Sequence, residues 1–309
     1  VGHPDRRRRG RQPRRRRGLT MNVVEAQIRS TLDAVSNGGG VEVREEWIEQ
    51  AGEEFKAALR KQFSPQPRDF TLRMSNIGRP LCQLQMQKAG AEESRKPYNH
   101  VVRMLIGDAV EAVMRLVLKA ADVPVTSDGD KVSLDVDGHE INGESDLDID
   151  GAVYDVKSAS PWAFKNKWKK GFEALQQEDD FGYIGQLYGY ADAQNKRAGG
   201  WVVIDKSSGE ICVVSAEASE EHLKEVRERR RRVVKAITED EPFARCFQPF
   251  TETYYGKPTG GKRLPKACTF CAFLGSCWPT ARLLPQPGSR AKTPPNHWYV
   301  EYPETGDGD

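Results

Sequence analysis

Two aspartates and a lysine lie close together in a stretch that has the pattern of a β-hairpin. Residues 141–158 read INGESDLDIDGAVYDVKS, with an Asp-Gly pair at positions 150 and 151. Asp-Gly is a strong signal for a two-residue turn, because both central positions of that turn need a positive φ. Folding about this turn places Asp146 opposite Asp155, and Lys157 follows on the same strand.

The hairpin register divides the side chains into an apolar and an acidic face, because opposite residues share a face. The apolar face carries Leu147, Ile149, Ala152, Tyr154 and Val156. The other face carries Glu144, Asp146, Asp148, Asp155 and Lys157. Like charges directly opposite each other are destabilising. Hard carboxylate oxygens suit Mg²⁺ or Mn²⁺, so one hypothesis is a bound divalent cation, and the alternative is a solvated acidic surface.

Gly143-x-x-Asp146, eight further residues and then Asp155-Val156-Lys157 resembles the core of PD-(D/E)XK nucleases of the RecB type. The resemblance implies that Asp146, Asp155 and the Val156 carbonyl hold one or two Mg²⁺ or Mn²⁺ ions. It also implies that Lys157 positions the attacking water or stabilises charge on the phosphate. The sequence departs from the family pattern in one place, because Ser145 stands where the family name has proline.

Two helical patterns supply further residues of the resemblance. In the amphipathic stretch 99–121, Gly107-x-x-x-Glu111 matches the family helix that delivers a ligand on the metal side, and His100 ranks second for this role. In the stretch 183–193, Gln186 and Tyr190 are four residues apart and share a helix face. The same Gln-x-x-x-Tyr arrangement follows the Asp-x-Lys strand in RecB-type nucleases, where it orients the lysine or the DNA strand.

Three of the six cysteines fall in one short segment, Cys268-x2-Cys271-x5-Cys277. Three thiolates leave a tetrahedral site incomplete. Cys82 is our first choice for the fourth ligand and Cys246 is the alternative. One early and three late cysteines resemble the iron–sulfur RecB-like nucleases, including AddB-type helicase–nucleases and the CRISPR-adaptation nucleases. That likeness implies a structural [4Fe-4S] cluster, with zinc as the competing metal.

The segment 162–172, WAFKNKWKKGF, mixes lysines with aromatic residues directly after the Asp-x-Lys strand. Lysines contact phosphates and aromatic rings stack on bases, so we expect a segment that faces DNA. The alternative is an amphipathic helix with a solvated basic face. The residues expected to contact DNA are Lys165, Lys167, Trp168, Lys169 and Lys170.

The strands and helices expected around these residues predict an α/β fold. The resemblance implies that this fold is restriction-endonuclease-like, with a mixed central sheet flanked by helices and an iron–sulfur module. We expect four parts: a disordered basic tail over 1–20, an N-terminal helical segment over 21–70 without a chemical role, and a nuclease domain over 71–282 that includes Cys82 and the module 266–279. The fourth part is a flexible tail over 283–309.

Composition agrees with a globular protein. The 309 residues are 38% hydrophobic and 30% charged, and the net charge is +2. Residues 6–17 contain nine arginines and no acid, so we expect the remainder to be mildly acidic and any affinity for nucleic acid to come from a local groove. The sequence has no apolar run of transmembrane length and no secretory signal pattern, which predicts a cytoplasmic location away from membranes. The resemblance implies that this is the cytoplasm of a bacterial or phage-infected cell.

These residues together predict a metal-dependent DNA nuclease, and an exonuclease acting on ends or single strands is preferred. The phosphate-binding motif of helicases is missing, so unwinding would need a helicase or recombinase as a partner. Two alternatives stay open: a non-catalytic nucleic-acid-binding protein, and a zinc-stapled module that recruits a recombinase or helicase.

Overall fold

The computed structural model describes residues 21–65 and 69–303, so the expectation of a disordered tail over 1–20 lies outside it. Among the described residues no helix is both long and apolar enough to cross a membrane. The helices are α1 Val23–Ser36, α2 Glu45–Phe63, α3 Leu81–Lys88, α4 His100–Ala120, α5 Pro161–Asn166, a 3₁₀ turn Trp168–Lys170, α6 Phe172–Gln177, α7 Tyr183–Gln194, α8 Glu220–Thr238, α9 Lys266–Thr269 and α10 Leu274–Cys277. The strands are β1 Val125–Ser127, β2 Lys131–Val136, β3 His139–Glu144, β4 Leu147–Ile149, β5 Ala152–Ala159, β6 Arg197–Asp205, β7 Ile211–Ser215, β8 Phe250–Tyr254, β9 Lys257–Arg263, β10 Arg282–Pro285 and β11 Asn296–Glu301.

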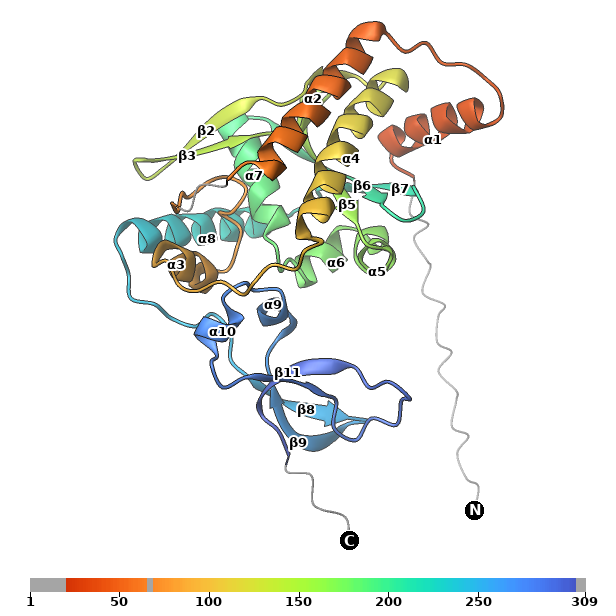
Figure 1. Cartoon of the computed structure of the whole chain (residues 1–309). Helices are drawn as coiled ribbons and strands as arrows, with labels where there is room; N and C mark the ends of the chain where they lie inside the picture. Colours follow the sequence, from red (N-terminus) through yellow and green to blue (C-terminus); the bar gives the residue numbers. More distant parts are fainter. Residues whose placement is uncertain (1–20, 66–68, 304–309) are drawn as a thin grey trace, which may run out of the picture.

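A five-stranded mixed sheet forms the centre of the protein, in the order β1-β4-β5-β6-β7. Strands β5 and β6 are parallel, and the other neighbours are antiparallel. The predicted hairpin register is confirmed, because Leu147 pairs with Tyr154. Asp150 and Gly151 have φ values of 47° and 70°, as the two-residue turn requires. The mixed α/β architecture, with helices flanking the sheet, also agrees with the prediction (Figure 1).

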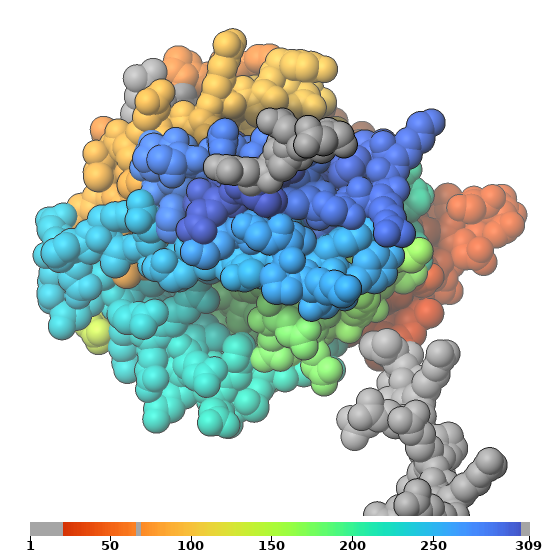
Figure 2. Space-filling model, turned by 90° about the horizontal axis from the view of Figure 1, so that it is seen from below, coloured from red at the N-terminus to blue at the C-terminus, as the bar shows by residue number. Residues whose placement is uncertain are grey.

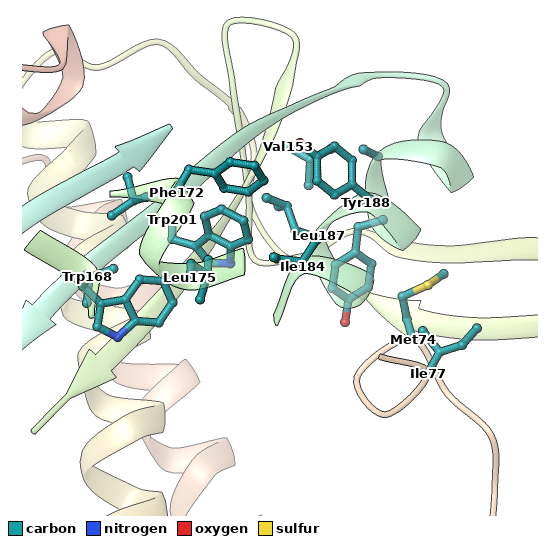
Figure 3. Close-up of a cluster of buried hydrophobic side chains, with 14 of the residues drawn as sticks. Met74, Ile77, Val153, Trp168, Phe172, Leu175, Ile184, Leu187, Tyr188 and Trp201 are labelled. Atoms are coloured by element: carbon teal, nitrogen blue, oxygen red, sulfur yellow. The ribbon is translucent and has the colours of Figure 1, made fainter. Parts of the chain in front are cut away.

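Both faces of this sheet are covered. Helices α1 and α4 pack on one face, where Ile28 and Leu118 meet Val156 and Val202. The helices from α5 to α8 cover the other face, and Figure 3 shows Trp168, Leu187 and Trp201 within that core. Part of the acidic side of the hairpin therefore faces protein, whereas Glu144 is exposed. A solvated acidic surface is ruled out for Asp148 and Asp155, since both are buried.

Helix α1 belongs to the main core. Its fully buried Ile28 packs on the sheet, and Arg29 Nη2 donates to the Ile211 carbonyl of β7 at 2.8 Å. Helix α2 packs along α4, and its residues Glu54 and Lys61 line a cleft described below. The expectation that residues 21–70 form a part of their own is therefore wrong, because α1 and α2 pack on the sheet and on α4; that this segment has no chemical role stays a prediction.

The expectation of a flexible tail from residue 283 is also wrong for its described part. Strands β10 and β11 pair with each other, and β11 pairs with β9 in a four-stranded sheet. Buried Tyr299 donates its hydroxyl proton to Glu252 at 2.7 Å, and Arg263 pairs with the same carboxylate at 3.3 Å. Figure 2, seen from below, shows this sheet in blue at the centre of that face.

The first prediction tests the place of α1 in the core. Ile28→Ala should lower the free energy of unfolding by about 2–5 kcal/mol, because it empties a fully buried site. Val23→Ala, at an exposed apolar residue of the same helix, should change it by less than about 0.5 kcal/mol. Equilibrium denaturation measures both, and equal effects would contradict the packing described for α1.

Candidate active site and cysteine pocket

The predicted site residues come together around the start of the hairpin. A cleft of about 1050 Å³ opens between helices α2 and α4 on one side and the β2–β3 hairpin on the other. Four of the six candidate catalytic residues line it: Glu111, Asp146, Gln186 and Tyr190. The other two, Asp155 and Lys157, lie on β5, inside the protein.

Asp155 and Lys157 form a buried ion pair. Lys157 Nζ lies 2.5 Å from Asp155 Oδ2, and the Asp155 side chain is only 1% exposed. Burial, which Lys157 opposes and neighbouring Asp146 reinforces, raises the pKa of Asp155 to about 7. Burial alone would lower the pKa of Lys157, but the carboxylates of Asp155 and Asp146 outweigh it and raise that pKa. Lys157 is therefore held as an ammonium group.

Asp146 is fixed in a bend just before β4. Its Oδ2 accepts a hydrogen bond from the Val156 N–H at 2.8 Å, which turns the carboxylate toward β5. Its backbone carbonyl accepts from Arg115 Nε at 3.3 Å, and Arg115 Nη1 pairs with Glu54 at 2.8 Å. Helices α2 and α4 thus hold the backbone of this aspartate in place.

Glu111 reaches the same region from α4. Burial raises its pKa to about 8, and Asp146 adds to the rise. Gly107 of the same helix lies near the end of β5, where a Cβ would be in ordinary contact with Ser158 Oγ at 3.9 Å, so no steric constraint requires glycine there. His100 begins the helix, roughly 16 Å away along its axis, and does not line the cleft. The geometry favours Glu111 over His100.

Gln186 and Tyr190 share the face of α7 that lines the cleft. Burial raises the pKa of Tyr190 to about 12, although a hydrogen bond with Gln186 opposes the rise. Packing explains why the motif has glycine at position 143. A Cβ there would lie 2.6 Å from Met74 Cβ and 2.8 Å from the Tyr190 ring, so a side chain would push β3 away from α7.

The donor chemistry of this region fits a divalent cation. Buried Asp155 Oδ1 has no hydrogen-bond partner among the described residues, and the charge of Asp146 adds to the raised pKa values of Asp155 and Glu111. A cation relieves both conditions. Within residues 21–65 and 69–303, however, no three His, Cys, Asp or Glu side chains are already arranged to hold a metal ion. Lys157 takes the place next to Asp155 Oδ2.

A second pocket gathers five cysteines from distant parts of the chain. Both candidates for the fourth ligand are present, because Cys82 of α3 and Cys246 line it together with the three late cysteines, Cys268, Cys271 and Cys277. The Cys82 N–H donates to Cys246 Sγ at 3.0 Å. The sixth cysteine, Cys212, lies apart in β7.

Hydrogen bonds join the two halves of the cysteine region. The Ser94 N–H donates to the Ala272 carbonyl at 2.7 Å, and Ser276 Oγ donates to the Glu92 carbonyl at 2.8 Å. Burial raises the pKa of Cys268 to about 12, with a further contribution from Cys271 and Cys277. Thiolates this close repel each other, and a bound metal would stabilise them as ligands.

The lysine-rich segment after β5 is only partly placed as expected. Trp168 is buried in the core, where its ring lies 5.4 Å from that of Tyr183, so the expectation that Trp168 stacks on DNA is wrong (Figure 3). Lys167 is also buried and donates to the Glu178 carbonyl, which removes it from the expected contact surface. The periodicity located an amphipathic segment but assigned the wrong ring to solvent. Lys165, Lys169 and Lys170 are exposed.

Three residues at the site escaped the sequence analysis. Arg115 and Tyr183 had a usable signal, because Arg115 is four residues beyond Glu111 and Tyr183 is three before Gln186, which places each on the same helix face. Lys157 Nζ lies 5.7 Å from the centre of the Tyr183 ring. Lys196 had no signal in the sequence. It pairs with buried Asp148, and this contact depends on the parallel arrangement of β5 and β6.

Comparisons with known proteins add little. No protein-family model matches the chain, and no curated protein matches it. Among solved structures, the crystal structure of SSO0001 is similar at 13% sequence identity with a TM-score of 0.39, covering 72% of this chain and 93% of that chain. A likeness at this level supports no inference about the function.

The second prediction concerns pH in the absence of divalent cations. Asp155 and Glu111 have pKa values raised to about 7 and about 8, so the folded protein keeps protons that the unfolded chain has already released. Stability should therefore fall as pH rises from roughly 5 to 8, by on the order of 2 kcal/mol. Thermal unfolding in EDTA across this range measures the fall.

Asp155→Asn and Glu111→Gln should each flatten this pH dependence. Glu49→Gln, at an exposed acid of α2, provides the matched control and should leave the slope as in the wild type. A slope that is the same in all three variants would show that other groups cause it.

Proposed function

We propose that this protein is a metal-dependent deoxyribonuclease that hydrolyses phosphodiester bonds, with exonuclease action on DNA ends or single strands preferred. The observation that carries the proposal is the buried Asp155–Lys157 pair beside Asp146 and Glu111, next to a wide cleft. Burying charges is costly, and perturbed carboxyls around a cleft are typical of active sites.

Asp146, Asp155, Glu111 and the Val156 carbonyl are the groups that would hold Mg²⁺ or Mn²⁺. A bound ion would polarise the phosphate and lower the pKa of a water molecule. The chain itself orients the ligands: the Val156 N–H holds Asp146 Oδ2, while Arg115 holds its backbone. Glu111 and Asp155 would give up their protons when the ion binds, because the positive charge of the ion would then stabilise the carboxylates in place of the protons.

Lys157 provides a fixed positive charge. Its ammonium group is kept protonated by Asp155 and Asp146, so it can stabilise charge that builds on the phosphate. Tyr183 lies beneath this group and restricts its position. Gln186 and Tyr190, on the same side of α7, would orient the DNA strand in the cleft.

The cysteine pocket supports a second part of the proposal, a structural [4Fe-4S] cluster held by Cys268, Cys271, Cys277 and Cys82, with zinc as the competing metal. All four thiols line one pocket, with Cys246 beside them as the alternative ligand. A metal there would link α3 to the C-terminal segment.

A helicase or recombinase partner would supply unwound DNA, in the cytoplasm of a bacterial or phage-infected cell.

The third prediction tests catalysis directly. Lys157→Ala should lower the rate of DNA cleavage with Mg²⁺ or Mn²⁺ by at least about 100-fold, because it removes a charge directed at the transition state. Binding of DNA should remain within a few-fold of the wild type. Gel assays of cleavage and fluorescence anisotropy measure the two effects.

Lys119→Ala is the matched control for that variant. Lys119 is 18% exposed, as is Lys157, and it pairs with Asp128 at 2.7 Å outside the site. It should keep full cleavage activity. A wild-type protein that binds DNA but never cuts it would replace the nuclease proposal with a binding function.

The fourth prediction identifies the metal of the cysteine pocket. Anaerobically purified protein should contain iron and show the broad visible absorption of a cluster. Cys268→Ala should lose both, and Cys212→Ala, at the cysteine of β7, should keep both. Comparing Cys82→Ala with Cys246→Ala identifies the fourth ligand. Stoichiometric zinc without iron would contradict the cluster and leave a zinc-stapled module.

A further inference from the structure

Three large aromatic side chains are exposed where the sheet domain meets the cysteine region. Trp162, Phe181 and Phe270 are 58%, 44% and 55% exposed, and we call them the aromatic patch. The Phe181 and Phe270 rings lie 5.7 Å apart, although 89 residues separate them in the chain. Lys266 Nζ lies 4.6 Å from the centre of the Trp162 ring and also pairs with Glu178, three residues before Phe181. Exposed apolar groups this large indicate a binding surface.

The aromatic patch continues to the candidate active site. The Phe181 ring stacks on Tyr183 with centroids 5.6 Å apart, and Tyr183 in turn lies beneath Lys157. Tyr183, Gln186 and Tyr190 follow one face of α7, which begins beside Phe181 of the aromatic patch and lines the cleft with Gln186 and Tyr190. One helix therefore connects the exposed rings with the groups proposed to act on DNA.

The charges around the aromatic patch favour a polyanion. Lys165 and Lys170 are exposed in the segment that follows Trp162, and Lys266 borders Trp162. Within 250–303, the described segment that contributes Phe270 and the C-terminal sheet, there are seven Lys or Arg residues against two Asp or Glu residues. In contrast, residues 21–249 contain 31 basic and 39 acidic residues. A purely apolar protein partner would not need this local excess of positive charge.

We propose that the aromatic patch binds a single-stranded segment of the DNA substrate by stacking of its bases, and leads that strand along α7 to Lys157. Stacking on side chains requires unpaired bases, so the aromatic patch would select single strands over duplex. The delivery of the strand to Lys157 rests on the proposed nuclease function, but the binding of single-stranded DNA does not require cleavage.

The fifth prediction tests the aromatic patch by binding of a fluorescent single-stranded oligonucleotide to the full chain in EDTA, where no metal-dependent cleavage occurs. Phe181→Ala should weaken binding roughly tenfold, and Phe181→Trp should restore it, because a larger ring still stacks. Trp162→Ala should act in the same direction. Affinity for blunt duplex should change less than affinity for the single strand.

Tyr255→Ala is the control, since Tyr255 is a still more exposed ring in the turn between β8 and β9. It should bind as the wild type does. Thermal unfolding checks that each variant is folded. If Phe181→Ala does not fold, Trp162→Ala, which changes a different element, tests the aromatic patch in its place. Equal binding by the folded patch variants, the wild type and Tyr255→Ala would overturn the inference.

The two proposals fail in different ways. If the wild type cuts DNA but the variants of the aromatic patch bind normally, only the stacking surface is wrong. If the wild type never cuts DNA but Phe181→Ala still weakens single-strand binding and Phe181→Trp restores it, the aromatic patch stands and the nuclease proposal falls.

Discussion

The buried ion pair of Asp155 and Lys157 constrains the rest of the structure. Taking two charges out of water costs several kcal/mol per ion, and the attraction between them roughly offsets this cost only with good geometry. The pair lies on β5, the middle strand of the sheet, which has a partner strand on each side and helices on both faces. Asp155 is opposite Trp201 of β6, and Tyr183 of α7 covers Lys157. A fold selected for stability alone would have apolar residues here, so the retained charges favour a chemical role.

The cysteine pocket is the second place that holds the molecule together, and it does so by connecting distant segments. Residues 82–94 and 245–277 meet there through the hydrogen bond from the Cys82 N–H to Cys246 Sγ and through the two hydrogen bonds that join the halves of the cysteine region. Within the C-terminal segment, the guanidinium carbon of Arg245 lies 4.1 Å from the centre of the Trp278 ring. The same junction carries a four-stranded sheet (Figure 1). A metal bound by thiolates from both segments would add a strong link at this point.

Local chemistry explains which features could be predicted from the sequence. The Asp-Gly turn and the alternation of side chains determined the hairpin register, and the helix pattern around Glu111 located α4. Burial of the acidic face depends on α7, which is distant in sequence, so no local pattern revealed it. Trp168 and Trp162 lie on one short segment, and only the packing of Trp168 against Trp201 decides which ring is inside. Strands β10 and β11 are separated by a proline-rich loop, so their pairing was equally hidden.

An acidic centre creates a problem for any polyanionic substrate, because phosphates are repelled by the same carboxylates that would hold a cation. Overall charge does not offset this repulsion, since residues 21–249 contain more acids than bases. Positive charge is instead local: the lining of the cleft includes Lys61, Arg73, Arg115 and Lys131 beside five acidic residues, and the C-terminal sheet carries an excess of basic residues. Coulomb interactions between exposed charges fall off within about 8 Å in physiological salt. A nucleic acid would therefore be attracted at the rim and along the aromatic patch, and would meet the carboxylates only where a cation has neutralised them.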